Sequence, residues 1–273
     1  MKPSSIRKIS VLLRSFLALL VFATVSSAQE PTRLEVKVDS VAREALVFAP
    51  ADAKTKHAPV VFAFHGHGGT AGHAARTMAF QKLWPEAIIV YPQGLKTKGI
   101  ITDTEGAKSG WQYRSGVDND RDYKFFDALL ARLRADYKVD AKHVFATGHS
   151  NGGAFTYMLW AERGTSFAAV APSAAVSQPA AMKLKPKPVL HLAGKKDPLV
   201  KFEWQDKMMK AVKIINNCTG ESKEWAKNCT LFPSSTATPL VAYIHEGGHE
   251  FPAAGAELIV KFFKEYAGEP KNL

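Results

Sequence analysis

A serine between closely spaced glycines is the first feature of this chain that could do chemistry. Residues 144–153 read Val-Phe-Ala-Thr-Gly-His-Ser-Asn-Gly-Gly, and a helix-compatible apolar segment, residues 154–161, follows. A G-x-S-x-G pattern between a strand and a helix raises the serine hydroxyl on a strained turn. Side chains at Gly148 and Gly152 would collide in so tight a turn. We therefore predict that Ser150 is a nucleophile, with a plain glycine-rich turn as the alternative.

A serine hydroxyl needs a base near neutral pH, and the base needs a carboxylate that orients it. In an open α/β sheet such groups gather at the carboxyl ends of the strands. Asp197 follows the apolar run 188–193, and His249 follows the run 240–244 on a glycine-rich loop. We predict that these two residues complete a triad with the serine, in the chain order Ser, Asp, His. The alternatives are a turn aspartate at this position and His245 as the base.

Acyl transfer also needs N–H donors aimed at the developing oxyanion. We predict the backbone N–H of Asn151, directly after the serine, and that of His67 in the loop His-Gly-His-Gly-Gly, residues 65–69. Several histidines also invite a metal-binding interpretation: His65, His67, His73 and His149. No carboxylate or cysteine joins them at a recognisable spacing, so we expect neither a metal nor another cofactor.

Two further residues are predicted to contact the substrate. Trp111 lies in the long, polar, glycine-rich segment 95–119, where an aromatic ring can line a pocket or pack beneath the loop. His149 precedes the serine in the turn.

The elements that must position these residues alternate along the chain. Two short alternating runs, residues 34–38 and 45–48, predict an antiparallel pair at a sheet edge. Continuous apolar runs predict strands buried on both faces: residues 60–64, 87–91, 143–147, 167–171, 188–193 and 240–244. Helices are predicted over residues 122–137, 154–161, 204–215 and 253–266. The alternation implies an α/β fold in which helices cover both faces of a mostly parallel central sheet.

The first 28 residues have the pattern of a signal peptide. Basic residues, among them Lys2 and Arg14, precede the apolar run 16–25, and Ser-Ser-Ala before Gln29 supplies a cleavage site. The run is short for a membrane span, although an uncleaved anchor is the alternative. We expect a signal peptide over residues 1–28, a catalytic domain over 29–273, and a secreted or periplasmic protein without a stable membrane anchor.

Charge and cysteine content narrow the class of protein further. The net charge of +11 falls to +7 once the four basic residues of the leader are removed. A basic surface can favour anionic polymers, but we find no nucleic-acid motif and expect a monomer that binds no nucleic acid.

Cys218 and Cys229 are the only cysteines. An even pair in an exported chain predicts a disulfide, with two buried thiols as the alternative.

Together these motifs resemble the secreted α/β-hydrolase esterases, the group of polyhydroxybutyrate depolymerases and feruloyl or acetylxylan esterases. The matching positions are residues 148–153, Trp111, Asp122-Tyr123-x-Phe125, residues 194–198 and residues 247–252. The resemblance covers roughly residues 58–265. It implies an α/β-hydrolase fold and a serine esterase that hydrolyses feruloyl, acetyl or hydroxyalkanoate-oligomer esters through an acyl-enzyme.

Two departures from the family pattern bear on the substrate. The oxyanion loop has a second histidine where depolymerases often carry a cysteine, and no separate substrate-binding domain is evident. We therefore expect a soluble ester or a short oligomer rather than a crystalline polymer. The alternatives are a serine peptidase or other acyl hydrolase on the same fold, and a non-catalytic binding protein that has kept the fold.

Overall fold

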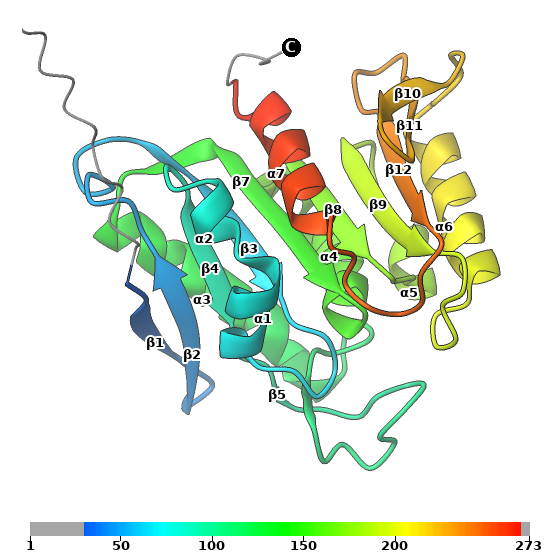
Figure 1. Ribbon diagram of the computed structural model, residues 1–273. Helices are drawn as coiled ribbons and strands as arrows, with labels where there is room; N and C mark the ends of the chain where they lie inside the picture. Colours follow the sequence, from blue (N-terminus) through cyan, green and yellow to red (C-terminus); the bar gives the residue numbers. More distant parts are fainter. Residues whose placement is uncertain (1–29, 269–273) are drawn as a thin grey trace, which may run out of the picture.

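The computed structural model describes residues 30–268, so the predicted signal peptide lies outside the described residues. The strands of the central sheet are β1 (Thr32–Val38), β2 (Val41–Phe48), β3 (Ala58–Phe64), β4 (Ile88–Pro92), β7 (Val139–His149), β8 (Ala169–Ser173), β9 (Val189–Gly194), β10 (Lys223–Ala226), β11 (Cys229–Phe232) and β12 (Leu240–His245). Their order across the sheet is β1-β2-β4-β3-β7-β8-β9-β12-β11-β10 (Figure 1). The stretch from β4 to β12 is parallel, and the strands beyond it at both ends are antiparallel.

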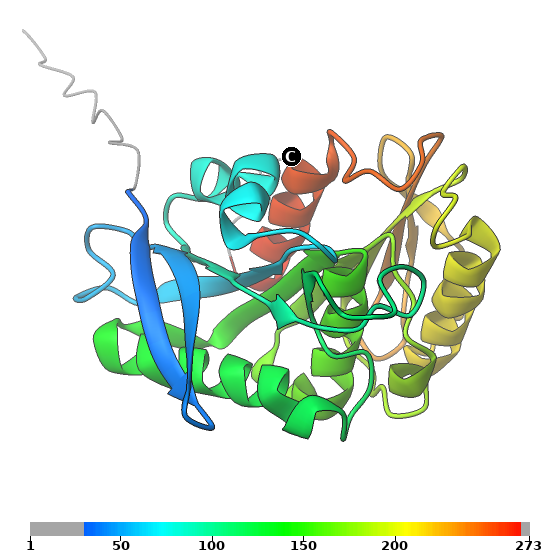
Figure 2. The same cartoon turned by 90° about the horizontal axis from the view of Figure 1, so that it is seen from below.

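Helices cover both faces of this sheet (Figure 2). On one face lie α1 (Ala71–Met78), α2 (Phe80–Leu83) and α7 (Gly255–Tyr266). On the other lie α3 (Arg121–Asp136), α4 (Asn151–Arg163), α5 (Gln178–Ala181) and α6 (Phe202–Ile215). Two 3₁₀ turns, η1 (Asp118–Asp120) and η2 (Gly164–Ser166), and the two-stranded hairpin β5 (Leu95–Lys96) and β6 (Ser109–Gly110) complete the fold.

The alternation of side chains along β3 divides the hydrophobic core in two. Val60, Phe62 and Phe64 pack into the core beneath α3, α4 and α6, whereas Val61 and Ala63 pack into the core beneath α1, α2 and α7. Burial of both faces explains why the strand reads as an unbroken apolar run. The predicted α/β architecture with a mostly parallel, two-sided sheet is confirmed.

The predicted elements are present, with shifted ends. The run at 143–147 is the middle of the longer β7, and the strand predicted at 167–171 begins two residues later, at Ala169. Helices α1, α2 and α5 and the hairpins β5–β6 and β10–β11 were not predicted. One signal was available for α1: the Thr70 side chain caps it by accepting the N–H of His73 at 3.1 Å.

A buried ion pair fastens the antiparallel edge hairpin to α3. Arg43 Nη2 lies 2.9 Å from Asp122 Oδ1, and both side chains are almost completely buried. The guanidinium also lies 4.0 Å from the centroid of the Phe125 ring. The second oxygen of Asp122 accepts the backbone N–H of Gln112 at 2.8 Å. The start of α3 is thereby tied to both the hairpin and the segment that follows Trp111.

The predicted disulfide between Cys218 and Cys229 is wrong, because both cysteines are free thiols in the structure. Cys218 packs against the core beneath α3, α4 and α6, whereas Cys229 is buried in the core on the other face of the sheet. Burial raises the pKa of the Cys229 thiol to about 11. The segment between the two cysteines includes β10 and leads into β11, which extends the sheet.

Within residues 30–268, no helix combines the length and the apolar character needed to cross a membrane.

Candidate active site

Ser150 occupies the sharp turn between β7 and α4. Its backbone angles are φ 56° and ψ −121°, a conformation that a residue with a side chain rarely adopts. A Cβ on Gly148 would lie 2.4 Å from the carbonyl oxygen of Gly152, and one on Gly152 would lie 2.3 Å from that of Phe64. Both distances are too short for a side chain, so the glycine requirement predicted from the sequence is confirmed.

The three residues predicted as a triad form a chain of two hydrogen-bonding contacts, with His249 in the middle. His249 Nε2 is 2.7 Å from Ser150 Oγ. His249 Nδ1 is 2.8 Å from Asp197 Oδ2 and 3.0 Å from Asp197 Oδ1. The loops after β9 and β12 bring the acid and the histidine to the turn after β7. His245, the other candidate base, instead accepts the N–H of Gly247 with its Nδ1 at 3.1 Å.

The Asp197 carboxylate is buried and held by several donors. Its Oδ1 accepts the backbone N–H groups of Leu199 and Val200 at 2.9 and 2.8 Å. Its Oδ2 accepts a third bond from the side-chain amide of Gln205 at 3.3 Å. These donors fix the plane of the carboxylate that faces His249.

A buried network behind Asp197 was missed by the sequence analysis. The Gln205 amide nitrogen also donates to the carbonyl of Val200 at 2.7 Å, which leaves its oxygen to face His191 Nε2 at 3.2 Å. His191 Nδ1 lies 2.7 Å from the hydroxyl of Tyr157. Burial lowers the pKa of His191 to about 4, so the neutral ring accepts from Tyr157 and donates to Gln205. The only signal in the sequence was a histidine inside the apolar strand.

The side chain of His149 holds the loop that carries His249. Its Nε2 donates to the carbonyl of His249 at 2.7 Å, and its Nδ1 lies 3.2 Å from Ser173 Oγ. Burial, with a smaller contribution from the neighbouring His249, lowers the pKa of His149 to about 4, so the ring is neutral near pH 7. His149, like the predicted triad residue His249, is not among the residues that line the cavity at Ser150, and its predicted contact with the substrate stays a prediction.

The two predicted oxyanion donors belong to segments that meet at Ser150. The N–H of Asn151 belongs to the first turn of α4, where backbone donors have no acceptor within the helix. The loop carrying His67 packs against the serine, since a Cβ on Gly66 would lie 3.5 Å from Ser150 Cβ. His67, Ser150 and Asn151 line one cavity.

The side chain of His67 fastens the segment between β5 and β6 to this loop. His67 Nε2 donates to Asp103 Oδ2 at 2.9 Å. The same carboxylate accepts the backbone N–H groups of Ala107 and Lys108 at 3.0 and 2.9 Å. The hydrogen bond from His67, together with those from the two N–H groups, lowers the pKa of Asp103 to about 2. The segment therefore has a fixed shape beside the nucleophile.

The cavity at Ser150 has a volume of about 880 Å³. It lies between the β5–β6 segment, which projects beyond the carboxyl ends of the parallel strands in Figure 1, and helix α6. Four exposed apolar side chains gather on its walls: Ile100 (70% exposed), Ile101 (53%), Trp204 (43%) and Leu199 (39%). An ester with an apolar acyl or alcohol group can therefore dock next to the serine.

Trp111 is fully buried beneath this region and does not line the cavity. Its ring stacks on Phe155 with the centroids 5.4 Å apart, and its Nε1 donates to the carbonyl of His65 at 2.8 Å. The side chain of Asn151 also clamps the Trp111 backbone, accepting its N–H at 2.7 Å and donating to its carbonyl at 3.0 Å. The predicted substrate contact is wrong, and the packing alternative is correct. Tyr113, two residues on, lines the cavity instead.

The histidines considered as metal ligands have other partners. His65 Nε2 accepts the N–H of Gly94 at 2.9 Å, and His73 Nε2 lies 3.4 Å from Thr77 Oγ1. In the part of the chain that the structure describes, no three His, Cys, Asp or Glu side chains are grouped so as to hold a metal ion.

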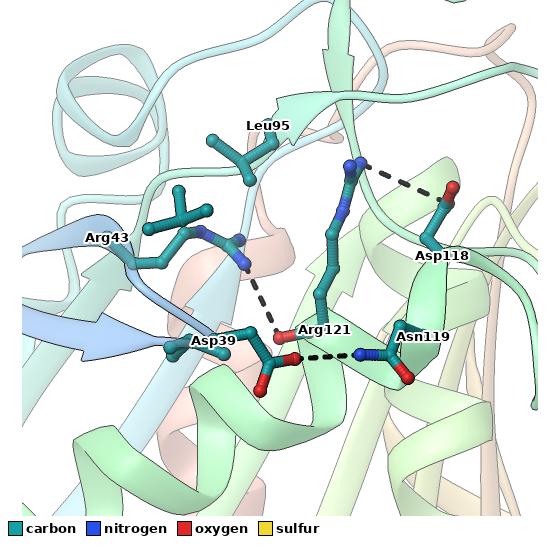
Figure 3. A pocket seen from close by; sticks show the side chains of 8 residues that line it. Asp39, Arg43, Leu95, Asp118, Asn119 and Arg121 are labelled. Carbon is teal, nitrogen blue, oxygen red and sulfur yellow. Dashed lines mark hydrogen bonds and ion pairs between the residues drawn. The ribbon is translucent and has the colours of Figure 1, made fainter.

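A second, smaller cavity of about 180 Å³ lies between the β1–β2 turn and the start of α3 (Figure 3). Arg43 reaches into it and donates to the carbonyl of Arg121 at 3.4 Å, and the Asn119 amide donates to Asp39 at 3.0 Å. No residue of the predicted triad lines this cavity, whereas Ser150 lines the larger one. We therefore place the candidate active site in the larger cavity.

The sequence was compared with known families and proteins. The profile of the Esterase family, described as "Putative esterase", matches residues 42–230, well over half of the chain. The match includes Ser150 and Asp197 and ends before His249. The chain is 23% identical over 184 residues to a bifunctional acetylxylan esterase/xylanase (XynS20E) of Neocallimastix patriciarum, covering 66% of this chain and 25% of that protein.

A second relative is the "Probable feruloyl esterase C" of Aspergillus clavatus, 31% identical over 133 residues, with 47% of this chain and 44% of the relative covered. The chain thus spans a quarter of the first relative's length and less than half of the second's. A solved ferulic acid esterase superposes with a TM-score of 0.63 at 16% identity, covering 88% of this chain and 99% of that one. The family and the relatives support a carboxylic ester hydrolase, and the superposition shows a shared fold. The chain therefore belongs to the Esterase family and has the α/β-hydrolase fold.

Proposed function

We propose that this protein is an exported serine esterase that hydrolyses carboxylic esters through an acyl-enzyme. The observation that carries the proposal is the chain of hydrogen bonds from Ser150 through His249 to Asp197, at the edge of an open cavity. Each predicted triad residue comes from a different loop, and the three meet in the order that proton transfer requires. A binding protein without turnover would have no need of this arrangement.

In the proposed reaction Ser150 Oγ attacks the ester carbonyl while His249 Nε2, 2.7 Å away, takes its proton. Asp197 holds the imidazole by Nδ1 and stabilises the charge that the ring gains. Collapse of the tetrahedral intermediate expels the alcohol, which receives the proton from His249. Water then attacks the acyl-enzyme by the same route and releases the acid and the free serine.

The backbone N–H groups of Asn151 and His67 would stabilise the negative charge on the carbonyl oxygen in both tetrahedral intermediates. Loss of one such donor typically lowers the rate about 10²- to 10³-fold. The bond from His67 to Asp103 and the clamp of Asn151 on Trp111 hold both donors in place before the substrate arrives.

The apolar walls favour a soluble ester or short oligomer with an apolar acyl or alcohol group. The relatives' names suggest feruloyl and acetyl groups, and the sequence resemblance adds hydroxyalkanoate oligomers.

For the whole protein we propose a signal peptide over residues 1–28, a catalytic domain over 29–273 and a secreted or periplasmic location. We also propose that the protein is a monomer and requires no cofactor.

Ser150→Ala tests this function. With 4-nitrophenyl acetate and feruloyl, acetylated-xylan and hydroxybutyrate-oligomer esters, we expect the wild type to hydrolyse at least one ester and the variant to lose that activity by at least about 10³-fold. Peptide substrates should remain intact. An unchanged melting temperature of the variant controls for folding. Retained activity of a folded variant, or cleavage of peptides in preference to esters, would contradict the proposal.

A further inference from the structure

The cavity at Ser150 carries positive charge that has no role in the proposed acyl-enzyme reaction. Lys98 and Lys207 both line the cavity, and no aspartate or glutamate does. Neither lysine forms an ion pair within residues 30–268, where other lysines such as Lys183 and Lys210 do. The cavity therefore presents two positive charges, neither of them in an ion pair with a described residue, between apolar walls.

Lys207 interrupts an apolar stripe of α6. Trp204, Met208 and Ala211 line the cavity with it, at the spacing that places residues on one helix face. The adjacent Asp206 is not part of this stripe; its carboxylate pairs with Lys210 at 2.6 Å. The only charged side chain that α6 contributes to the cavity is thus a free ammonium group, where an apolar residue would fit the pattern.

Lys98 reaches the cavity from a different segment, between β5 and β6. It is exposed and lies beside Ile100 and Ile101 on the same wall. The only carboxylate of this segment that touches the oxyanion loop, Asp103, is occupied by His67 and two backbone N–H groups. Asp103 is therefore not available to neutralise Lys98.

Building on the proposed esterase function, we propose that the cavity prefers esters with a negative charge, a carboxylate carried on an apolar body. Lys98 and Lys207 are the specificity-determining residues that attract this carboxylate, while the apolar walls hold the rest of the molecule. Because both ammonium groups are exposed to water, we expect each to favour the anionic ester by about three- to fivefold, the upper part of the range of exposed ion pairs. The preference should weaken as salt screens the charges.

Two pairs of esters probe both sides of the scissile bond. On the acyl side, mono-4-nitrophenyl suberate ends in a carboxylate and the 4-nitrophenyl ester of suberamic acid ends in a neutral amide of the same length. On the alcohol side, 4-carboxyphenyl acetate is compared with 4-carbamoylphenyl acetate. The readout is the ratio of kcat/KM for the charged and neutral members, in the wild type, Lys98→Met, Lys207→Met and the double variant. Comparing the ratio between variants cancels the intrinsic reactivity of each ester.

The control is Lys210→Met, which removes an exposed, ion-paired lysine from the same helix outside the cavity. We expect the ratio for at least one pair to fall about three- to fivefold in each single variant and about tenfold or more in the double variant. Lys210→Met should leave the ratio unchanged, and 0.5 M NaCl should reduce the wild-type ratio. If the ratios for both pairs are the same in the wild type and the double variant, the inference is wrong while the esterase function stands. If the wild type hydrolyses neither these four esters nor any ester of the panel used with Ser150→Ala, the esterase function itself fails.

Discussion

At the scale of the residue, the candidate site depends on side chains that orient one another. His149 donates a hydrogen bond to the backbone carbonyl of His249, and the Gln205 amide donates one to the Asp197 carboxylate. The triad was predictable from the sequence because Ser150 lies in a local motif and the acid and histidine follow strand ends. The roles of His149 and Gln205 could not be predicted from the sequence, because they depend on which loop packs against each side chain in three dimensions.

Gln205→Leu tests whether the buried network positions the triad acid. The change removes one donor to the Asp197 carboxylate and leaves His191 without its acceptor. Hydrogen bonds to charged groups contribute roughly 1.5–3 kcal/mol, so we expect kcat to fall about tenfold or more with KM nearly unchanged.

A double-mutant cycle with Asp197→Ala distinguishes positioning from a general loss of structure. If Gln205 acts through the carboxylate, Gln205→Leu should have little further effect once that carboxylate is absent. Equal factors in the two backgrounds would show that Gln205 supports the fold rather than the acid.

At the scale of the element, the β5–β6 hairpin sets the distance between the segments that carry the two predicted oxyanion donors, His67 and Asn151. Gly110 of β6 lies between them: a Cβ there would be 2.5 Å from His67 Nδ1 and 2.9 Å from Asn151 Oδ1. The sequence indicated a polar, glycine-rich loop in this region. It did not reveal the hairpin, because two-residue strands carry no detectable periodicity.

Gly110→Ala should therefore disturb the oxyanion donors without touching the triad. We expect kcat/KM to fall between about 10- and 100-fold, less than the complete loss of a donor, because His67 and Asn151 must move apart. Gly72→Ala is the matched control: it lies within α1, meets only the end of the flexible Arg76 side chain, and should leave activity unchanged. Full activity of Gly110→Ala would contradict this role of the hairpin.

At the scale of the whole molecule, the sheet separates two hydrophobic cores. Which of the two cores a cysteine joins could not be predicted from the sequence. The number of residues between Cys218 and Cys229 permits a disulfide, yet the two thiols belong to cores on opposite faces. Which face a residue outside the apolar strands joins depends on packing along the entire chain. The fold class itself was predictable, because six continuous apolar runs alternate with helical segments along the chain.

The whole molecule should lose stability in mild acid. Burial lowers the pKa of His65, His149 and His191 to about 4, below the ordinary value of 6.5. Between about pH 6.5 and pH 4 the unfolded chain binds protons at these rings and the native state does not, so stability is present above this window and falls as pH falls through it. Each ring contributes up to about 1.4 kcal/mol per pH unit.

Urea unfolding at pH 6.5, 6.0, 5.5 and 5.0 measures this dependence in a range where carboxylates contribute little. We expect the free energy of unfolding to decrease at each step. A free energy of unfolding that is constant over this range would show that the three rings are protonated in the native state.

The most direct measurement of the central claim is mass spectrometry after reaction with a fluorophosphonate, which phosphonylates only an activated serine. We expect the wild type to gain the mass of one adduct, located at Ser150 by peptide mapping. The reaction should be much slower in His249→Ala and absent in Ser150→Ala. An unlabelled wild type, or an adduct that persists on another residue of Ser150→Ala, would contradict the account.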